Sequence, residues 1–161
     1  MLQLQKVTKK YKTKAGEVYA LNGVSLTFPS TGMVFITGKS GCGKTTLLNV
    51  IGGLDRVDGG EIFVQDKGLF AFSAKEYDSY RNTFVGFVFQ EYNLLAEYSV
   101  EYNVKIAMEL QGRNADEAEL ERLLKEMEIE GLRNRKPSEL SGGQRQRVAI
   151  ARAGRIYSSS F

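Results

Sequence analysis

Residues 38–45 of this chain read GKSGCGKT, which matches the pattern of a glycine, any four residues and then Gly-Lys-Ser/Thr. Such a loop wraps a phosphate group when it lies between a buried strand and the start of a helix. Gly38, Gly41 and Gly43 allow backbone angles at which several N–H groups point toward one anion. The pattern therefore predicts an α/β domain that binds a nucleoside triphosphate.

The sequence on both sides of this loop agrees with that arrangement. Residues 33–37 form a short apolar run of the kind found in a strand buried on both faces. Residues 44–51 favour a helix with one apolar side, and Gly52 with Gly53 favours its end. We therefore expect a strand, the loop and a helix in succession, whereas the alternative, an ordinary glycine-rich turn, requires neither flank.

Two residues of the loop have expected chemical roles. Lys44 is expected to reach the β- and γ-phosphates, and Thr45 is expected to ligate Mg²⁺. The remaining residues expected to bind the nucleotide are Gly38, Lys39, Ser40, Gly41, Cys42, Gly43 and Thr46.

A second motif lies near the end of the chain, where residues 140–153 read LSGGQRQRVAIARA. This stretch resembles the signature of the ATP-binding-cassette (ABC) ATPases. In that family the signature of one subunit covers the γ-phosphate of an ATP held by the P-loop of another, so that two ATP molecules lie between two domains. The residues that would contact ATP in trans are Ser141, Gly142, Gly143 and Gln144. The plainer interpretation of the motif is a capped helix start followed by a solvated arginine face, comprising Arg145, Arg147 and Arg152.

Two further positions resemble functional residues of this family. Gln90 follows the apolar run at residues 85–89, which reads as a strand, and resembles the Q-loop glutamine that ligates Mg²⁺ and the attacking water. With Lys44, it is an expected catalytic residue. Tyr11 resembles the aromatic residue that stacks on adenine, a contact of about 1–3 kcal/mol where bases stack on aromatic side chains. The alternatives are a polar strand end for Gln90 and a half-buried edge tyrosine for Tyr11.

The N-terminal half of the chain predicts antiparallel strands beside the nucleotide site. Leu2, Leu4 and Val7 alternate loosely with polar residues, which favours a first strand closed by Tyr11. Further strands are expected at residues 18–28 and 61–65. Ser73 with Glu76 is expected to open a short helix.

The sequence changes to a helical period after Gln90, and this resembles the helical subdomain of the family, here expected over about residues 91–153. Ser99 is expected to cap a helix that runs through about Gln111. Asn114, with Glu117 three residues later, is expected to cap the next helix.

Two segments, VGFVFQEYNLLAEYSV and NVIGGLDRVDGGEI, resemble the exporter branch of the ABC family, which includes macrolide export, lipoprotein release and antimicrobial-peptide resistance. The resemblance implies ATP and Mg²⁺ as ligands. It also implies a second ATP-binding subunit and a transmembrane permease as partners, and a cytoplasmic location on the inner face of the cell membrane. The alternatives are a soluble ABC ATPase without a permease, and a nucleotide-binding module or inhibitory fragment that pairs with an intact subunit.

The sequence departs from the family after the signature. The family continues with an apolar strand that ends in Asp-Glu and, later, a switch histidine; this chain reads GRIYSSSF instead and contains no histidine. The expected fold is an α/β P-loop NTPase of the ABC type, with an N-terminal antiparallel β subdomain, a helical subdomain and missing C-terminal core strands. Residues 1–161 are thus expected to form an incomplete ATP-binding domain with an atypical tail at 154–161, which binds ATP but hardly hydrolyses it. We expect unpaired edges at residues 33–37 and 85–89.

Composition agrees with one globular domain, since 42% of the 161 residues are hydrophobic and 25% are charged. The net charge of +3 is too small to indicate a nucleic-acid partner, and no apolar run approaches the length of a membrane span. The basic cluster near the N-terminus is interpreted as a solvated edge and comprises Lys9, Lys10, Lys12 and Lys14. Cys42 is the one cysteine, which excludes an internal disulfide and fits a reducing compartment.

Overall fold

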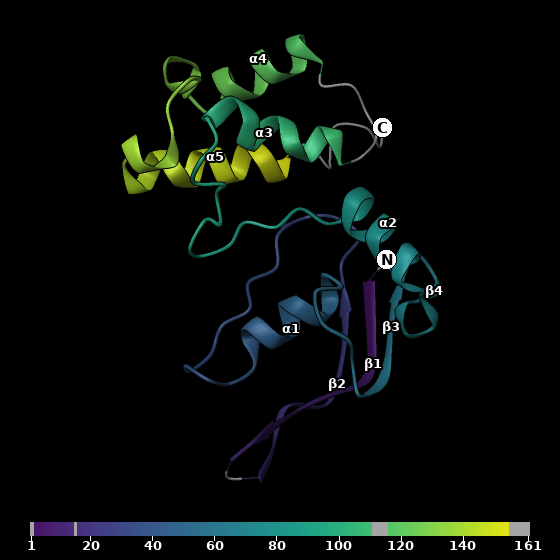
Figure 1. Cartoon of the computed structure of the whole chain (residues 1–161). Helices are drawn as coiled ribbons and strands as arrows, with labels where there is room; N and C mark the ends of the chain where they lie inside the picture. The colour runs from purple at the N-terminus through teal and green to yellow at the C-terminus, as the bar shows by residue number, and fades with distance from the viewer. Residues whose placement is uncertain (1, 15, 111–115, 155–161) are drawn as a thin grey trace. The chain divides into compact units, whose positions relative to one another are not determined.

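The computed structural model describes residues 2–14, 16–110 and 116–154. The chain divides into two compact units, Met1–Ser79 and Tyr80–Phe161, and each is described here by itself. The first unit holds the strands and the helix that follows the glycine-rich loop, and the second holds three longer helices (Figure 1). This arrangement of an antiparallel sheet and helices confirms the predicted α/β class.

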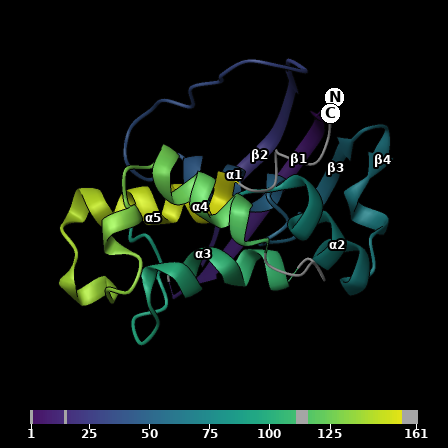
Figure 2. The same cartoon turned by 90° about the horizontal axis from the view of Figure 1, so that it is seen from above.

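The first unit is built on a four-stranded antiparallel sheet with the order β2-β1-β3-β4 (Figure 2). The strands are β1 (Leu2–Thr13), β2 (Gly16–Phe28), β3 (Gly59–Val64) and β4 (Lys67–Gly68). β1 and β2 form one long hairpin, whose register runs from the pair Leu2 and Phe28 to the pair Thr13 and Gly16. The three predicted N-terminal strands are therefore confirmed.

The side chains on one face of this sheet form its core. Leu4 and Val7 of β1 are buried, and a shift of register between them keeps both on that face although they are three residues apart. Lys6 lies in this irregular stretch with φ of 50°. Gly60 of β3 approaches so closely that a Cβ there would lie 2.3 Å from the carbonyl oxygen of Lys6. A glycine is therefore required where β3 passes the irregularity.

Two helices follow the loop and β4, of which α1 (Lys44–Ile51) belongs to the first unit and α2 (Ala74–Phe84) extends past its last residue, Ser79. Helix α1 directly follows the glycine-rich loop, buries Leu47 and Val50, and ends at Gly52, as predicted. Helix α2 begins with a reciprocal pair, in which Ser73 N donates to the Glu76 carboxylate at 2.8 Å and Glu76 N donates to Ser73 Oγ at 3.3 Å. A 3₁₀ turn, η1 (Leu69–Ala71), precedes it. The capping pair expected from the sequence is confirmed.

Two predicted strands are wrong. Residues 33–37 and 85–89 have no strand hydrogen bonding, and Met33 and Phe35 are each 78% exposed. A strand exists only where a neighbour pairs with its backbone N–H and C=O groups, and the sheet within the described residues consists of β1 to β4 alone. The apolar composition of both segments therefore does not produce strands in this structure.

The second unit is helical. Its helices are α3 (Val100–Glu109), α4 (Glu117–Glu126) and α5 (Gly142–Gly154), with 3₁₀ turns η2 (Glu130–Leu132) and η3 (Pro137–Glu139) before α5. α3 packs against both α4 and α5 (Figures 1 and 2). The side chains that form the core of this unit include Val100, Val104, Met108, Leu120, Leu124, Ile129 and Val148.

Two predicted N-terminal caps can be compared with the helices of this unit. Ser99 caps α3 as expected, since its hydroxyl accepts a hydrogen bond from Tyr102 N at 3.2 Å. The cap of α4 is Asp116, whose carboxylate accepts from Ala118 N at 3.1 Å, so the prediction of Asn114 is wrong. Asp116 is the cap because it directly precedes the first helical residue, where its carboxylate reaches the free N–H groups. Asn114 and Gln111, the predicted end of α3, lie outside the described residues.

None of the helices within the described ranges has both the length and the apolar composition needed to cross a lipid bilayer.

Candidate nucleotide-binding site

The glycine-rich loop has the backbone conformation that the sequence predicts. Gly38, Gly41 and Gly43 have φ values of 151°, 77° and 93°. Gly43 is also constrained by packing, because a Cβ there would lie 2.3 Å from the carbonyl oxygen of Ala20 in β2. The loop is thus pressed against the sheet at the point where α1 begins.

The start of α1 is suited to an anion. Gly43 precedes the first helical residue and provides no side-chain cap, and the first turn contains no acidic residue. The first N–H groups of a helix have no partner within the helix, and the helix dipole adds positive potential at the same end. A phosphate group at this position would satisfy those donors, so the loop fits the ligand that its sequence predicts.

Lys44 folds back over its own loop. Its ammonium group donates hydrogen bonds to the carbonyl oxygens of Gly38 at 2.9 Å and Lys39 at 2.7 Å, and it lies 3.7 Å from Cys42 Sγ. These contacts hold the positive charge inside the loop. The phosphate-binding role of Lys44 stays a prediction, and Thr45 is exposed in the first turn of α1.

Tyr11 lies beside this part of the site. It pairs with Val18 in the β1–β2 hairpin, its side chain is 40% exposed, and its hydroxyl donates to Asp55 Oδ2 at 2.9 Å. The neighbouring Thr46 side chain, from the first turn of α1, acts to lower the pKa of this hydroxyl. Burial and the Asp55 acceptor raise the pKa of Tyr11, so its hydroxyl stays protonated. The structure thus brings together Tyr11 and Thr46, two residues that the sequence assigns to the nucleotide.

Lys9 and Asp55 belong to the same cluster and were not predicted. Lys9 is 9% exposed, and its ammonium group donates to Asp55 Oδ1 and to the carbonyl oxygen of Arg56, both at 2.7 Å. The interpretation of Lys9 as part of a solvated edge is wrong. The signal was present in the alternation of β1, because Lys9 lies two residues after the buried Val7 and so faces the same side.

The charges of this pair reinforce each other. Burial lowers the pKa of Lys9, but Asp55 outweighs it, so the pKa is raised above its usual value. Burial likewise raises the pKa of Asp55, and the hydrogen bonds from Lys9 and Tyr11 outweigh it, so that pKa is lowered. Both groups are therefore ionised over the whole neutral range.

Gln90 is exposed and lies in the second unit. It begins a loop whose backbone accepts hydrogen bonds from a side chain of α5. Tyr92 and Asn93 have φ values of 59° and 46°, which are unusual for residues other than glycine. The guanidinium of Arg152 donates to the carbonyl oxygens of Tyr92 at 2.8 Å and Asn93 at 2.7 Å. This loop is also held from α3, by a residue that sequence reasoning missed.

That residue is Asn103, which is fully buried. Its side chain accepts from Leu95 N at 2.7 Å and donates to the carbonyl oxygens of Leu95 at 3.1 Å, Tyr98 at 3.3 Å and Ser99 at 2.9 Å. The sequence signal was a polar residue beside Val100 and Val104 on the apolar side of a predicted helix. Buried amides of this kind are hydrogen-bonded to a backbone that lacks regular partners.

The residues of the signature form a capped helix start. Ser141 N donates to Gln144 Oε1 at 2.8 Å, and Gln144 N donates to Ser141 Oγ at 3.3 Å. A Cβ added to Gly142 would lie 3.8 Å from the Tyr92 hydroxyl, and one added to Gly143 would meet no atom of another segment within 4 Å. The plainer interpretation is therefore correct for the cap, and the contact with ATP in trans stays a prediction.

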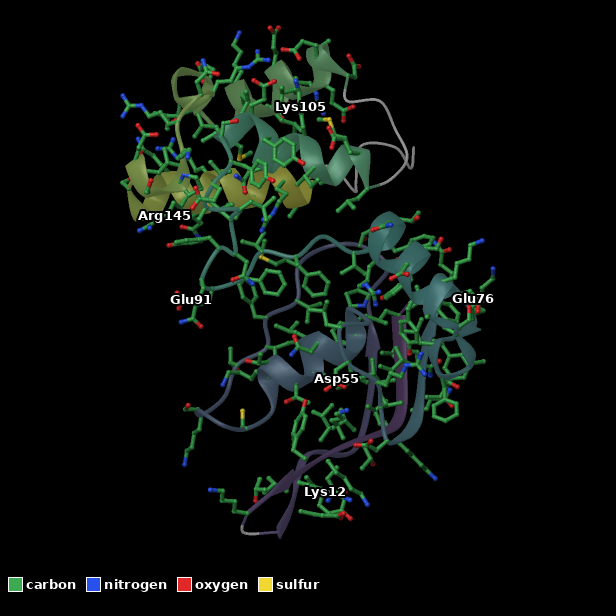
Figure 3. All side chains as sticks on the ribbon, in the orientation of Figure 1. Lys12, Asp55, Glu76, Glu91, Lys105 and Arg145 are labelled. Carbon is green, nitrogen blue, oxygen red and sulfur yellow. The ribbon has the colours of Figure 1, made fainter. Side chains whose placement is uncertain are left out.

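The prediction of a solvated arginine face holds for Arg145, which is exposed, and is wrong for Arg152. Burial lowers the pKa of Arg152, which binds the two backbone carbonyl groups described above. Arg147 donates to Glu128 at 3.0 Å, and Arg145 lies 6.0 Å from the centre of the Tyr92 ring (Arg145 is labelled in Figure 3). All three side chains contact residues of the second unit, in which α5 lies.

The described residues hold no group of three or more His, Cys, Asp or Glu side chains arranged to bind a metal ion. The predicted Mg²⁺ ligands are of a different kind, since they are a hydroxyl, on Thr45, and an amide, on Gln90. Both stay predictions.

Comparison with known proteins gives the family. The sequence model of the family described as "ABC transporter" matches residues 21–155. The lipoprotein-releasing system ATP-binding protein LolD of Buchnera aphidicola subsp. Schizaphis graminum is 41% identical over 155 residues, which cover 95% of this chain and 68% of the relative. LolD of Chromohalobacter salexigens is 39% identical over a stretch that covers 95% of this chain and 65% of the relative. The sulfate/thiosulfate import ATP-binding protein CysA of Vibrio vulnificus is 42% identical over 144 residues, which cover 86% of this chain and 40% of the relative.

The fold is similar to that of a solved ATP-binding cassette. The dimeric post-hydrolysis state of MJ0796 bound to ADP and Pi matches with a TM-score of 0.88 and 38% identity, over 95% of this chain and 68% of that chain. The chain thus spans about two thirds of the length of the LolD relatives and of this cassette.

Proposed function

The chain belongs to the ABC transporter family, and we propose that residues 38–46 of its first unit bind the triphosphate of ATP. The observation that carries this proposal is the uncapped start of α1 behind a loop with three glycines at positive φ. In this assignment Lys44 binds the β- and γ-phosphates, and Tyr11 stacks on adenine. Mg²⁺, for which Thr45 would supply a hydroxyl ligand, would neutralise phosphate charge, and the metal-binding role of Gln90 stays a prediction.

At the level of the transporter, the proposed role is that of an ATP-binding subunit located on the cytoplasmic face of the membrane. It would couple ATP binding and hydrolysis to export through a separate or fused permease. Export is supported by the lipoprotein-releasing relatives of Buchnera aphidicola and Chromohalobacter salexigens, whose similarity extends over 95% of the chain. The second ATP-binding subunit would receive Ser141 and Gln144 over its γ-phosphate, a role supported by the dimeric form of the similar cassette.

For the 161-residue chain by itself we expect binding without efficient hydrolysis. Phosphoryl transfer to water needs bound phosphates, a placed metal ion and an oriented water molecule. The sequence contains no histidine, and Glu139 is its last acidic residue, so none follows the signature to orient water.

The test is binding of a fluorescent ATP analogue, with Mg²⁺, to the purified chain, followed by competition with ATP. The Lys44→Ala variant should lose at least tenfold in affinity, because a charge-assisted phosphate contact is removed. Lys75→Ala, which removes an equal charge from α2, should bind as the unaltered chain does. Equal binding by Lys44→Ala would refute the site, and phosphate release at a rate typical of ABC ATPases would refute the expected lack of hydrolysis.

A further inference from the structure

We propose that Asp55 is a positioning residue for the nucleotide, which fixes the ring of Tyr11 in the orientation that receives the base. The proposal rests on the function proposed above and adds a residue that lies outside the glycine-rich loop. It is carried by the cluster of Lys9, Asp55 and Tyr11, here called the Tyr11 cluster, which joins β1 to the segment after α1.

Asp55 is held at several points. Its Oδ1 accepts from Lys9 Nζ and from Arg56 N, both at 2.7 Å, and its backbone N–H donates to the carbonyl oxygen of Asn49 in α1 at 3.3 Å. Figure 3 labels Asp55 beside α1. The second oxygen, Oδ2, is the one that accepts from the Tyr11 hydroxyl at 2.9 Å. Asp55 thus connects the aromatic ring, through its carboxylate, to the helix that begins at the phosphate loop, through its backbone N–H.

Lys9 keeps this carboxylate charged and in place. Its side chain is 11% exposed, against 31% for that of Asp55, and its ammonium group also donates to the carbonyl oxygen of Arg56 at 2.7 Å. The same ammonium lies 5.4 Å from the centre of the Tyr11 ring. The ring is therefore restrained at its hydroxyl by Asp55 and near its face by Lys9.

Such restraint matters because the Tyr11 side chain is 40% exposed. An exposed side chain that samples several rotamers must be ordered when a ligand binds, and this ordering weakens the affinity. A ring that is already fixed avoids that loss. Removing the hydroxyl that Asp55 holds should thus weaken ATP binding by about two- to tenfold, the range set by immobilising one such side chain.

A merely structural role for Asp55 would have a different signature. General loosening of the first unit would weaken every ligand of the loop, with or without a base. Loss of ring orientation would weaken only ligands that carry a base. The affinity ratio of Mg-ATP to Mg-tripolyphosphate separates the two, because both ligands use residues 38–46 and only ATP uses Tyr11.

The experiment measures both affinities by isothermal titration for the full chain and for Tyr11→Phe, which keeps the ring and removes the hydroxyl. We expect a two- to tenfold weaker affinity for Mg-ATP and an unchanged affinity for Mg-tripolyphosphate. Tyr19→Phe, which alters a tyrosine of β2 that is 51% exposed and lies near Lys10, is the matched control and should change neither.

The double variant Tyr11→Phe/Asp55→Ala tests the partner. Its affinity ratio should equal that of Tyr11→Phe, since Asp55 acts on the base through the hydroxyl. Mg-ATP binding by Tyr11→Phe at the original affinity would overturn the proposal, as would equal losses for both ligands. If the unaltered chain binds neither ligand, the proposed function itself is wrong.

Discussion

Gly43 packs against Ala20 so closely that a methyl group on its α-carbon would lie 2.3 Å from the Ala20 carbonyl oxygen. The end of the glycine-rich loop is therefore fixed by the sheet as well as by its own backbone angles. Gly41 is a useful contrast, because its φ of 77° is also positive but a Cβ there would meet no atom within 4 Å.

We expect substitution by alanine to cost less stability at Gly41 than at Gly43. Gly41→Ala should destabilise the first unit by about 1 kcal/mol, the usual cost of a left-handed conformation for alanine. Gly43→Ala adds a clash with backbone and should cost about 2–4 kcal/mol. Thermal unfolding of both variants checks this, and an equal fall in Tm would contradict the close approach to β2.

Asn103 should contribute strongly to the stability of the second unit. Asn103→Ala removes the four hydrogen bonds to residues 95–99 and leaves buried backbone groups without partners, at a cost of about 2–4 kcal/mol. Urea denaturation measures the loss, and hydrogen exchange at the Leu95 amide should lose its protection. Asn134→Ala, at an exposed position, is the control and should change stability by less than about 0.5 kcal/mol. An Asn103→Ala variant with Leu95 still protected would show that another group holds the loop.

The parts of this chain that could be predicted are those with local causes. The angles of Gly38, Gly41 and Gly43 and the start of α1 follow from the needs of a few adjacent residues. Ser99 caps α3 for the same reason.

The parts that could not be predicted depend on distant partners. Lys9 and its partner Asp55 are 46 residues apart, and Arg152 and its partner carbonyl on Asn93 are 59 apart. The alternation of β1 indicates that Lys9 faces the core, but no local pattern identifies either partner. Residues 33–37 were predicted as a strand from their apolar composition, but strand formation is decided by a pairing partner elsewhere in the chain.

Arg152 should hold the loop after Gln90 in a way that lysine cannot reproduce. Its planar group donates to two successive carbonyl oxygens, of Tyr92 and Asn93, whereas an ammonium group is a single point of contact. Arg152→Lys should cost about 1–2 kcal/mol and should speed proteolytic cleavage near residues 92–93. Arg147→Lys is the matched control on the same helix, and should have little effect because its partner Glu128 is 82% exposed. Similar cleavage rates for the two variants would rule out the proposed hold on the loop.

Glu101 should make the stability of the second unit depend on acid pH. Its carboxylate accepts from Arg133 Nε at 2.6 Å and also from Lys105, which is labelled in Figure 3. The hydrogen bond from Arg133, followed by that from Lys105, lowers the pKa of Glu101 from 4.5 to about 2. Because the folded-state pKa lies below the unfolded one, the stabilisation is fully present above about pH 4.5. It is lost as the pH falls from there toward 2.

Glu101→Gln isolates this contribution. Between pH 5 and pH 2, the unfolding free energy of the unaltered chain should fall by at most about 3 kcal/mol more than that of Glu101→Gln. This is an upper limit because the Glu101 side chain is 23% exposed and its charge is partly screened by solvent. Glu97→Gln is the control, because Glu97 is 86% exposed and lies 3.6 Å from Lys136, so its loss should match that of the unaltered chain. Urea denaturation at a series of pH values provides the measurement. Parallel pH profiles for Glu101→Gln and the unaltered chain would mean that Arg133 and Lys105 do not stabilise the ionised carboxylate in solution.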